Sequence, residues 1–156
     1  MCGLVGFFGP DRDGASALAM AMAEKIRHRG PDGHGVWTDP SAGLAIAHRR
    51  LAVVDLSEAG QQPMISSNGR LVIAFNGEIY NHHELRQKVQ AAGWGGPWRG
   101  YSDTETLLAA LQIWGVERVL PMLNGMFAFA LWDRQRQVLT LARDRTGEKP
   151  LYYGQS

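Results

Sequence analysis

The sequence predicts a single α+β domain built from layered antiparallel sheets and helices. Its 156 residues suit one compact domain, in which roughly 68–70% of the unfolded surface would be buried. Short apolar segments of strand type pair into hairpins, helical stripes cluster between them, and a regular alternation of strand and helix is absent. These observations favour antiparallel sheets over a parallel α/β arrangement.

The first part of the chain begins with a strand and a helix. Leu4–Phe8 is an apolar run that ends at a Gly-Pro pair, as expected for a short strand before a turn. Ala15–Arg27 carries Leu18, Met22 and Ile26 at i, i+4 and i+8, the spacing of one helix face. From their apolar and β-branched content, further strands are predicted at Gly35–Thr38, Leu44–His48, Leu51–Asp55 and Leu71–Phe75.

The second part of the chain is predicted to hold two helices and a hairpin. Ser102 and Glu105 fit a capping box, in which the two side chains satisfy backbone N–H groups at the start of a helix. Gly93–Gly100 contains four glycines and a proline, which predicts a loop. The predicted helices are His82–Ala92 and Thr104–Gly115, and the predicted hairpin strands are Met126–Trp132 and Val138–Arg143.

Composition and charge exclude several classes of function. Lys and Arg number 16 against 15 Asp and Glu, and the formal charge of +1 gives no field to attract nucleic acid or an anionic membrane. No apolar run approaches the roughly 18 residues needed to cross a bilayer. The N-terminus also lacks the basic start and the cleavage site of a signal peptide. We therefore predict a cytoplasmic protein whose partners include neither nucleic acid nor membrane.

The cysteine and histidine content argues against a metal site. The single cysteine excludes both an internal disulfide and a cysteine-rich zinc site. The five histidines are scattered along the chain, without the HxxxH or HExxH spacing of a helical metal site. The sequence therefore predicts no bound metal and one free thiol.

That thiol belongs to Cys2, which is the first candidate for chemistry. If Met1 is removed, the thiol lies on the residue that carries the free α-amine, and both groups titrate near neutral pH. One residue would then supply both the nucleophile and its general base. The alternative is that Cys2 is a small apolar residue at the start of a buried strand, which its position alone favours.

An ordered series of segments favours the catalytic role of Cys2 over the structural one. The segments are MCGLVG at Met1–Gly6, RHRGPDG at Arg27–Gly33, HRRLAVVD at His48–Asp55, FNGEIYN at Phe75–Asn81, YSDTE at Tyr101–Glu105, NGMFAFALWD at Asn124–Asp133 and RDRTGEKPLYYG at Arg143–Gly154. The series resembles the glutaminase domain of class II glutamine amidotransferases of the asparagine synthase type, in order and over nearly the whole chain. The resemblance implies the fold of N-terminal nucleophile hydrolases, a four-layer αββα sandwich with two antiparallel sheets.

The resemblance also implies a catalytic centre. In that family the cysteine, here Cys2, attacks the side-chain amide of glutamine, releases ammonia and leaves a thioester that water hydrolyses. Such acyl transfer needs an oxyanion hole, for which Asn76 and Gly77 offer a side-chain amide and a backbone N–H. Without the resemblance, this Asn-Gly pair indicates a hairpin turn that ends the preceding strand. Asn124-Gly125 matches no oxyanion element of the family and is predicted to form only a turn.

Recognition of the amino-acid end of glutamine is assigned by the same resemblance. Arg50 matches the arginine that binds the α-carboxylate, and its planar fork suits a bidentate contact. Asp103 and Glu78 match the acidic residues that hold the α-ammonium group. Val53 and Val54 match positions that line the pocket.

Ordinary structural roles remain open for these charged residues. Asp103 could support the first turn of the following helix, and Arg50 could form a surface ion pair. Arg49 faces the opposite side of the strand from Arg50 and is predicted to be solvated. The RHRGPDG segment is predicted to form a loop on the active-site side, with no catalytic role for Arg27 or Asp32.

The resemblance implies a glutaminase that takes L-glutamine and supplies ammonia to an ATP-dependent synthetase domain of the same enzyme. It implies no cofactor for this domain, and ATP and magnesium only for the synthetase domain. We expect residues 1–156 to be the glutaminase domain, truncated at its C-terminal end and without the synthetase domain. The oligomeric state, including a homodimer, stays open.

The ammonia acceptor is left open as well. The asparagine synthase type favours an asparagine synthase-like enzyme, and the alternative acceptor is a sugar or another carboxylate. Two other classes of function compete. One is a catalytically silent regulatory or docking module; the other is an acylase or peptidase of the same superfamily, against which the Arg50 and Asp103 pair argues by demanding a free amino acid.

Overall fold

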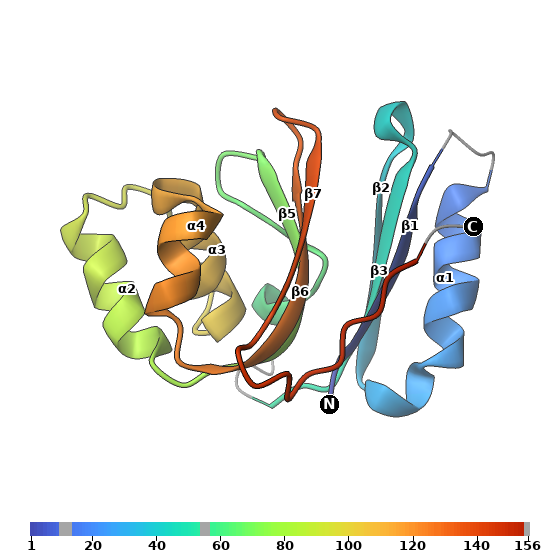
Figure 1. Cartoon of the computed structure of the whole chain (residues 1–156), viewed down its shortest axis with the longest axis horizontal. Coiled ribbons are helices and arrows are strands. Elements are labelled where there is room, and N and C mark those ends of the chain that lie inside the picture. Colours follow the sequence, from blue (N-terminus) through green and yellow to red (C-terminus); the bar gives the residue numbers. More distant parts are fainter. Residues whose placement is uncertain (10–13, 54–56, 155–156) are drawn as a thin grey trace.

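Two antiparallel sheets pack face to face between layers of helices in the computed structural model, which describes residues 1–9, 14–53 and 57–154 (Figure 1). The first sheet has the order β1-β3-β2, formed by Gly3–Phe8, Leu44–Arg50 and Gly33–Asp39. The second has the order β4-β5-β6-β7, formed by Met64–Ile65, Leu71–Ile79, Gly125–Asp133 and Val138–Arg143. The arrangement confirms the predicted α+β class and its αββα layers.

Helices cover the outer face of each sheet (Figure 1). Helix α1 (Ala15–Lys25) packs on the first sheet, and α2 (His82–Ala91) and α3 (Asp103–Trp114) cover the second. The short helix α4 (Val116–Val119) follows α3. Single 3-10 turns lie at Arg27–Arg29 (η1), Pro40–Ala42 (η2), Glu58–Gly60 (η3) and Leu120–Met122 (η4).

The period of two along each strand separates three apolar layers. On β3, Leu44 and Ile46 face the second sheet, where they pack with Val72, Ala74 and Trp132. The alternate residues Ala45 and Ala47 pack against Ala19 and Ala23 of α1. On β5, Ile73, Phe75 and Ile79 face α2 and α3 instead. The same alternation continues into the polar ends of these strands and decides which side chains enter the space between the sheets.

Most predicted elements are present, with small shifts of their ends, but two expectations about strands are wrong. Leu51–Val53 lies outside any strand, and residues 54–56 fall outside the described part of the chain. Strand β5 does not end at the Asn76-Gly77 pair but continues through it to Ile79, because β6 pairs with it along its whole length. The two-residue strand β4 was not predicted at all.

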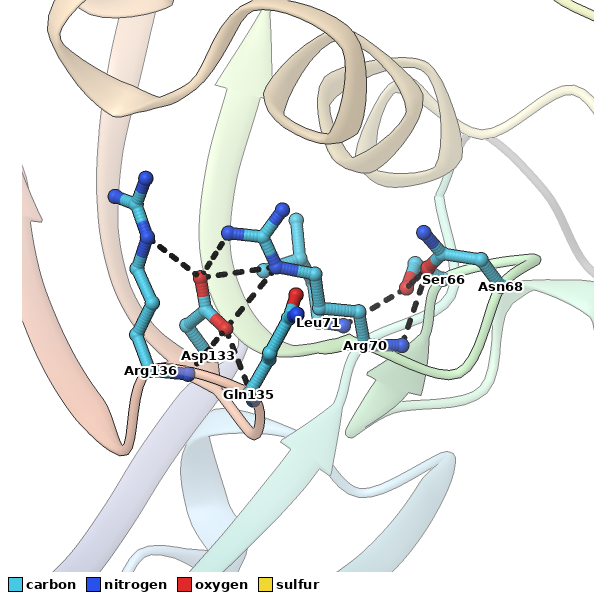
Figure 2. Close-up of polar contacts among 7 residues, drawn as sticks. All are labelled: Ser66, Asn68, Arg70, Leu71, Asp133, Gln135 and Arg136. Atoms are coloured by element: carbon cyan, nitrogen blue, oxygen red, sulfur yellow. Dashed lines mark hydrogen bonds and ion pairs between the residues drawn. The ribbon is translucent and has the colours of Figure 1, made fainter.

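Polar contacts tie together the end of the second sheet that lies away from the N-terminus. The Asp133 carboxylate accepts hydrogen bonds from the Arg70 guanidinium, with Nε at 3.1 Å, and from the backbone N–H groups of Gln135 and Arg136 (Figure 2). Arg70 precedes β5 and Asp133 ends β6, so this cluster joins the β4–β5 turn to the β6–β7 turn. The candidate site lies at the opposite end of the sandwich, where the chain begins.

Candidate active site

A cavity of about 170 Å³ lies at the end of the sandwich where Cys2 precedes β1. Its size is below the roughly 300–1,000 Å³ of pockets for drug-sized ligands and suits a smaller molecule. Four elements meet there: the start of β1, the end of β3, the second half of β5 and the first turn of α3. The predicted site residues that line it are Cys2, Arg50, Val53, Asn76, Gly77, Glu78 and Asp103. Val54, the remaining one, lies outside the described residues.

The Cys2 thiol is held at the point where β3 ends. Its Sγ lies 3.3 Å from the backbone N–H of Leu51, which donates to it, and 3.6 Å from the Leu51 carbonyl. The Cys2 carbonyl accepts a hydrogen bond of 3.2 Å from Arg29 Nε. Cys2 is half-buried and lies before the strand rather than inside it. These contacts fix the residue on both sides while the thiol lines the cavity.

The backbone N–H of Gly77 does not take part in the pairing of β5 with β6. Gly77 lies opposite Phe127, whose N–H donates to Asp144 Oδ2 at 3.1 Å and whose carbonyl accepts from the Asp144 N–H at 2.8 Å. Both polar backbone groups of Phe127 therefore point away from β5. Gly77 and Phe127 form a non-hydrogen-bonded pair.

The neighbours of Gly77 along β5 show where its N–H points. Phe75 donates its N–H to Gln62 Oε1 at 2.6 Å, and Ile79 donates to Asp103 Oδ2 at 2.9 Å. Backbone groups two residues apart in a strand point the same way, so the Gly77 N–H lies on this same open edge, between the two occupied positions. The result is a backbone donor in the cavity wall.

Asn76 and Glu78 extend from β5 into the space between the sheets, because they alternate with Phe75 and Ile79. Asn76 is only 5% exposed. No other group in residues 1–9, 14–53 and 57–154 hydrogen-bonds its side-chain amide, which lines the cavity. Glu78 is half-buried on the same face of the strand. Two groups of opposite character, an amide donor and a carboxylate, therefore lie side by side along one face of β5.

The two arginines at the end of β3 are both buried but lie on opposite faces of the sheet. Arg50 is buried, lines the cavity and donates from Nη1 to the Ser57 carbonyl at 2.9 Å. Arg49 lies on the α1 side of the sheet, where Nη2 is 2.6 Å from a carboxylate oxygen of Glu24. The expectation that Arg49 is solvated is wrong: it is 5% exposed, because α1 covers this face. Arg50 is 8% exposed and is therefore not a surface residue.

Asp103 opens helix α3 and faces the cavity. Its Oδ1 accepts from the Thr104 N–H at 2.8 Å, and its Oδ2 accepts from the Ile79 N–H at 2.9 Å. Burial raises the pKa of the Asp103 carboxyl, and these two backbone bonds act against that rise. Asp103 thus supports the first turn of its helix and joins α3 to β5. Because each carboxylate oxygen can accept two bonds, it retains capacity for a further donor.

Val53 lies outside the close-packed part of the site. Its side chain is 71% exposed at the edge of the cavity, beyond the end of β3. Its contribution to the lining therefore comes from the loop backbone and from an apolar group at the mouth.

Three residues of the site were not singled out from the sequence. Gln62 bridges β5 and α3, since it accepts from Phe75 N–H and donates to Thr104 Oγ1 at 3.3 Å. Lys149 is a buried wall residue of the cavity, and Arg29 binds the Cys2 carbonyl. Two of them belong to motif segments, RHRGPDG and RDRTGEKPLYYG, but only their contacts distinguish them from their neighbours.

The described residues contain no cluster of three or more His, Cys, Asp or Glu side chains that could hold a metal ion. None of the helices in that part of the chain has the length and apolarity to span a membrane.

Known proteins resemble the chain along its whole length. Residues 1–156 match the family described as the glutamine amidotransferase domain. Asparagine synthetase [glutamine-hydrolyzing] 1 of Bacillus subtilis is 41% identical over 157 residues, which cover 98% of this chain and 24% of that protein. Asparagine synthetase B [glutamine-hydrolyzing] of Escherichia coli is 40% identical over 156 residues, which cover 99% of this chain and 27% of the relative. The chain thus spans about a quarter of the length of the curated relatives it matches.

A solved structure shares the fold. Glutamine phosphoribosylpyrophosphate (PRPP) amidotransferase from B. subtilis superimposes with a TM-score of 0.72 over 90% of this chain and 37% of that one, at 24% sequence identity. The two sheets and their helical layers are therefore an arrangement that distant sequences share. The whole-length match and the similarity to asparagine synthetases confirm the resemblance of the motifs, and the chain belongs to the glutamine amidotransferase domain family.

Proposed function

We propose that this domain hydrolyses the side-chain amide of L-glutamine to glutamate and ammonia, with Cys2 as the nucleophile. The observation that carries the proposal is the Gly77 N–H, which is left out of the β5–β6 pairing beside the Asn76 amide, in one cavity with the only thiol of the chain. Two donors that no described residue occupies, next to a nucleophile, are the parts that acyl transfer requires.

The chemistry begins with the removal of Met1, which frees the α-amine of Cys2. That amine accepts the thiol proton, and the sulfur attacks the amide carbon of glutamine. Negative charge develops on the amide oxygen, where the Asn76 amide and the Gly77 N–H donate to it. The intermediate collapses as the carbon–nitrogen bond breaks, and the protonated amine gives its proton to the departing ammonia. Water then attacks the thioester, releases glutamate and restores the thiol.

The remaining charges of the cavity suit a free amino acid. The Arg50 guanidinium would bind the α-carboxylate, and Glu78 and Asp103 would accept hydrogen bonds from the α-ammonium group. A peptide or an N-acylated substrate lacks one of these two charges. The pairing of a buried cation with two carboxylates therefore favours glutamine over the substrates of an acylase or peptidase.

We further propose that the ammonia passes to a synthetase domain that uses ATP and magnesium, in an asparagine synthetase-like enzyme. The support is the similarity to asparagine synthetases, of which the chain matches about a quarter. The glutaminase step itself requires only the residues named above. The two proposals are separable, because glutamine hydrolysis can be measured without any acceptor.

Glutamine turnover by the purified chain tests the first proposal. Intact mass first identifies the fraction that begins at Cys2, and glutamate and ammonia are then measured for the unmodified chain, for Cys2→Ala and for a chain whose N-terminal extension is left uncleaved. We expect equal amounts of both products from the unmodified chain and none from the other two. Turnover by Cys2→Ala, or by the extended chain, would show that the thiol or its amine is not used.

Covalent labelling supplies a readout that does not depend on turnover. A glutamine analogue with an electrophilic side chain should add one equivalent to the unmodified chain, and glutamine should protect it. Since Cys2 is the only cysteine, the Cys2→Ala chain is the matched control for labelling elsewhere. A catalytically silent module would show neither turnover nor protected labelling.

A further inference from the structure

A buried ammonium group lies in the wall of the cavity without a charged partner in the part of the chain that the structure describes. Lys149 is 4% exposed and lines the same cavity as Cys2. Its Nζ lies 3.2 Å from Met1 Sδ, a thioether that accepts hydrogen bonds only weakly. Within residues 1–9, 14–53 and 57–154, no carboxylate comes within ion-pair distance of this Nζ. A buried cation costs free energy unless it is paired, so fold stability alone does not account for it.

The backbone of Lys149 is held firmly in place by Asp144. Asp144 Oδ2 accepts from the Lys149 N–H at 3.0 Å, and Oδ1 accepts from the Glu148 N–H at 2.9 Å and from the Thr146 hydroxyl at 3.0 Å. Burial raises the pKa of the Asp144 carboxyl, but these hydrogen bonds outweigh it and hold the pKa well below its usual value. An ionised carboxylate therefore fixes the 144–149 turn and presents Lys149 to the cavity.

Asp144 also connects this turn to the oxyanion side of the site. The same Oδ2 accepts from the Phe127 N–H, and Phe127 is the residue opposite Gly77. One carboxylate thus holds both the backbone of Lys149 and the β6 residue that lies opposite Gly77. This shared anchor joins the turn that carries Lys149 to strand β6.

We propose that Lys149 acts on the general base: once Met1 is removed, its ammonium group loses the thioether contact and keeps the α-amine of Cys2 neutral, the form that accepts the thiol proton. This inference rests on the proposed glutaminase function and deepens it. Lys149 is a positioning residue in electrostatic terms, because it acts through the amine and not on the substrate.

Other charged groups lie around Cys2, in the cavity wall or on the turn that carries Lys149, and their balance would set the protonation of the amine. The groups are Arg29 on η1, Arg50 on β3, Glu78 on β5, Asp103 on α3, and Asp144 and Glu148 on the turn that carries Lys149. The carboxylates favour the protonated, inactive amine, whereas the cations favour the neutral one. Arg29 donates from Nε to the Cys2 carbonyl, while its buried Nη2 has no partner among the described residues. Arg50 donates to the Ser57 carbonyl and, in our proposal, binds the substrate carboxylate. Within residues 1–9, 14–53 and 57–154, the Lys149 ammonium group contacts only Met1 Sδ, and that contact ends when Met1 leaves.

The test is the pH dependence of kcat/KM for glutamine hydrolysis, measured from about pH 5.5 to 9.5 on protein shown by intact mass to begin at Cys2. Lys149→Met removes the positive charge and keeps a side chain of similar length, and Lys149→Gln is a second neutral variant. Lys149→Arg retains the positive charge. Lys88→Met removes an exposed lysine of α2 as the matched control. Thermal unfolding midpoints are recorded for every variant.

We expect the acid limb of the profile to move to higher pH by about one unit in the two neutral variants. Their kcat/KM should fall roughly tenfold at pH 7 and approach that of the unmodified chain near pH 9. Lys149→Arg and Lys88→Met should keep the limb in place. A neutral variant whose kcat/KM falls by the same factor at every pH would overturn the proposal, as would an unmoved limb.

Folding of the variants and turnover by the unmodified chain distinguish the remaining outcomes. If both neutral variants fail to fold while Lys149→Arg folds, Lys149 is a structural residue and the proposal is wrong. If the unmodified chain with a free Cys2 amine does not hydrolyse glutamine, the proposed function itself fails. An active unmodified chain with an unmoved limb would leave the function standing and remove only the role of Lys149.

Discussion

Gly77 on β5 and Phe127 on β6 face each other so closely that no side chain fits between them. A Cβ atom built on Gly77 would lie 2.3 Å from the Met126 carbonyl oxygen and 2.7 Å from Phe127 Cβ. Glycine is therefore required here by the close approach of two strands rather than by a turn. The N–H of Gly77, which is left out of the β5–β6 pairing, lies on the side of the strand that lines the cavity.

Gly77→Ala should damage both the fold and the site. The added methyl group must push β6 away, which should lower the free energy of unfolding by roughly 1–3 kcal/mol and displace the N–H donor. We expect glutamine turnover to fall at least about 100-fold, the effect of losing one oxyanion donor. Urea denaturation and kcat measure the two effects. Gly95→Ala, where a Cβ meets nothing within 4 Å, is the control; turnover of folded Gly77→Ala equal to that of this control would contradict the oxyanion role.

Asn76→Ala should lower kcat by roughly 10²–10³ with a smaller change in KM, because the lost amide donor acts on charge that develops in the transition state. Steady-state glutaminase kinetics measure both constants. Asn124→Ala is the matched control, since Asn124 also precedes a glycine but is exposed and does not line the cavity. A kcat for Asn76→Ala within tenfold of the unmodified chain would remove Asn76 from the oxyanion hole.

Arg50→Lys should raise KM for glutamine by about 10-fold or more, since a lysine cannot reproduce a bidentate carboxylate contact worth roughly 1.5–3 kcal/mol. The change should leave kcat nearly the same, because this end of the substrate does not react. Arg49→Lys is the adjacent control: Arg49 pairs with Glu24 on the α1 side, so this variant should change stability but not KM. Equal KM values for the two variants would refute the assignment of Arg50.

The contrast between Asn76-Gly77 and its surroundings shows what local sequence can and cannot predict. The dipeptide is a turn former by itself, yet nine residues of β5 pair with β6 through it. That pairing is a long-range property and overrides the local preference. By contrast, the faces of β3 follow from periodicity alone, and the opposite orientation of Arg49 and Arg50 was predictable without the structure.

The helix cap of α3 was predictable from local sequence, whereas the contacts of Glu105 and Lys149 were not. Ser102 caps α3 as predicted, with its hydroxyl accepting from the Glu105 N–H at 3.1 Å. The Glu105 carboxylate instead accepts from the N–H groups of Arg99 and Gly100, because the preceding loop folds back over it. Lys149 reaches Met1 across 148 positions of sequence. No local pattern encodes such a contact, so the RDRTGEKPLYYG segment is recognisable in the sequence but the burial of its lysine against Met1 is not.

His48 gives the fold a dependence on pH that is separate from catalysis. Its ring is fully buried between the sheets, where Nε2 lies 3.0 Å from the Phe75 carbonyl oxygen and Nδ1 has no partner among the described residues. Burial lowers the pKa of His48 to about 4, against the opposing effect of the Phe75 carbonyl and with help from Arg50. The folded protein therefore holds this histidine neutral over a range in which the unfolded chain protonates it.

The stability that His48 contributes should be fully present above about pH 6.5 and be lost as pH falls towards 4, because the unfolded state binds the extra proton in that interval. The full effect is roughly 3 kcal/mol. His48→Gln retains a donor for the Phe75 carbonyl but does not titrate. Between pH 7 and pH 4.5, the free energy of unfolding of this variant should fall by about 2 kcal/mol less than that of the unmodified chain. Urea denaturation at several pH values measures the difference, and the exposed His34→Gln serves as the control. Parallel stability curves for His48→Gln and the unmodified chain would mean that the buried ring is not kept neutral by the fold.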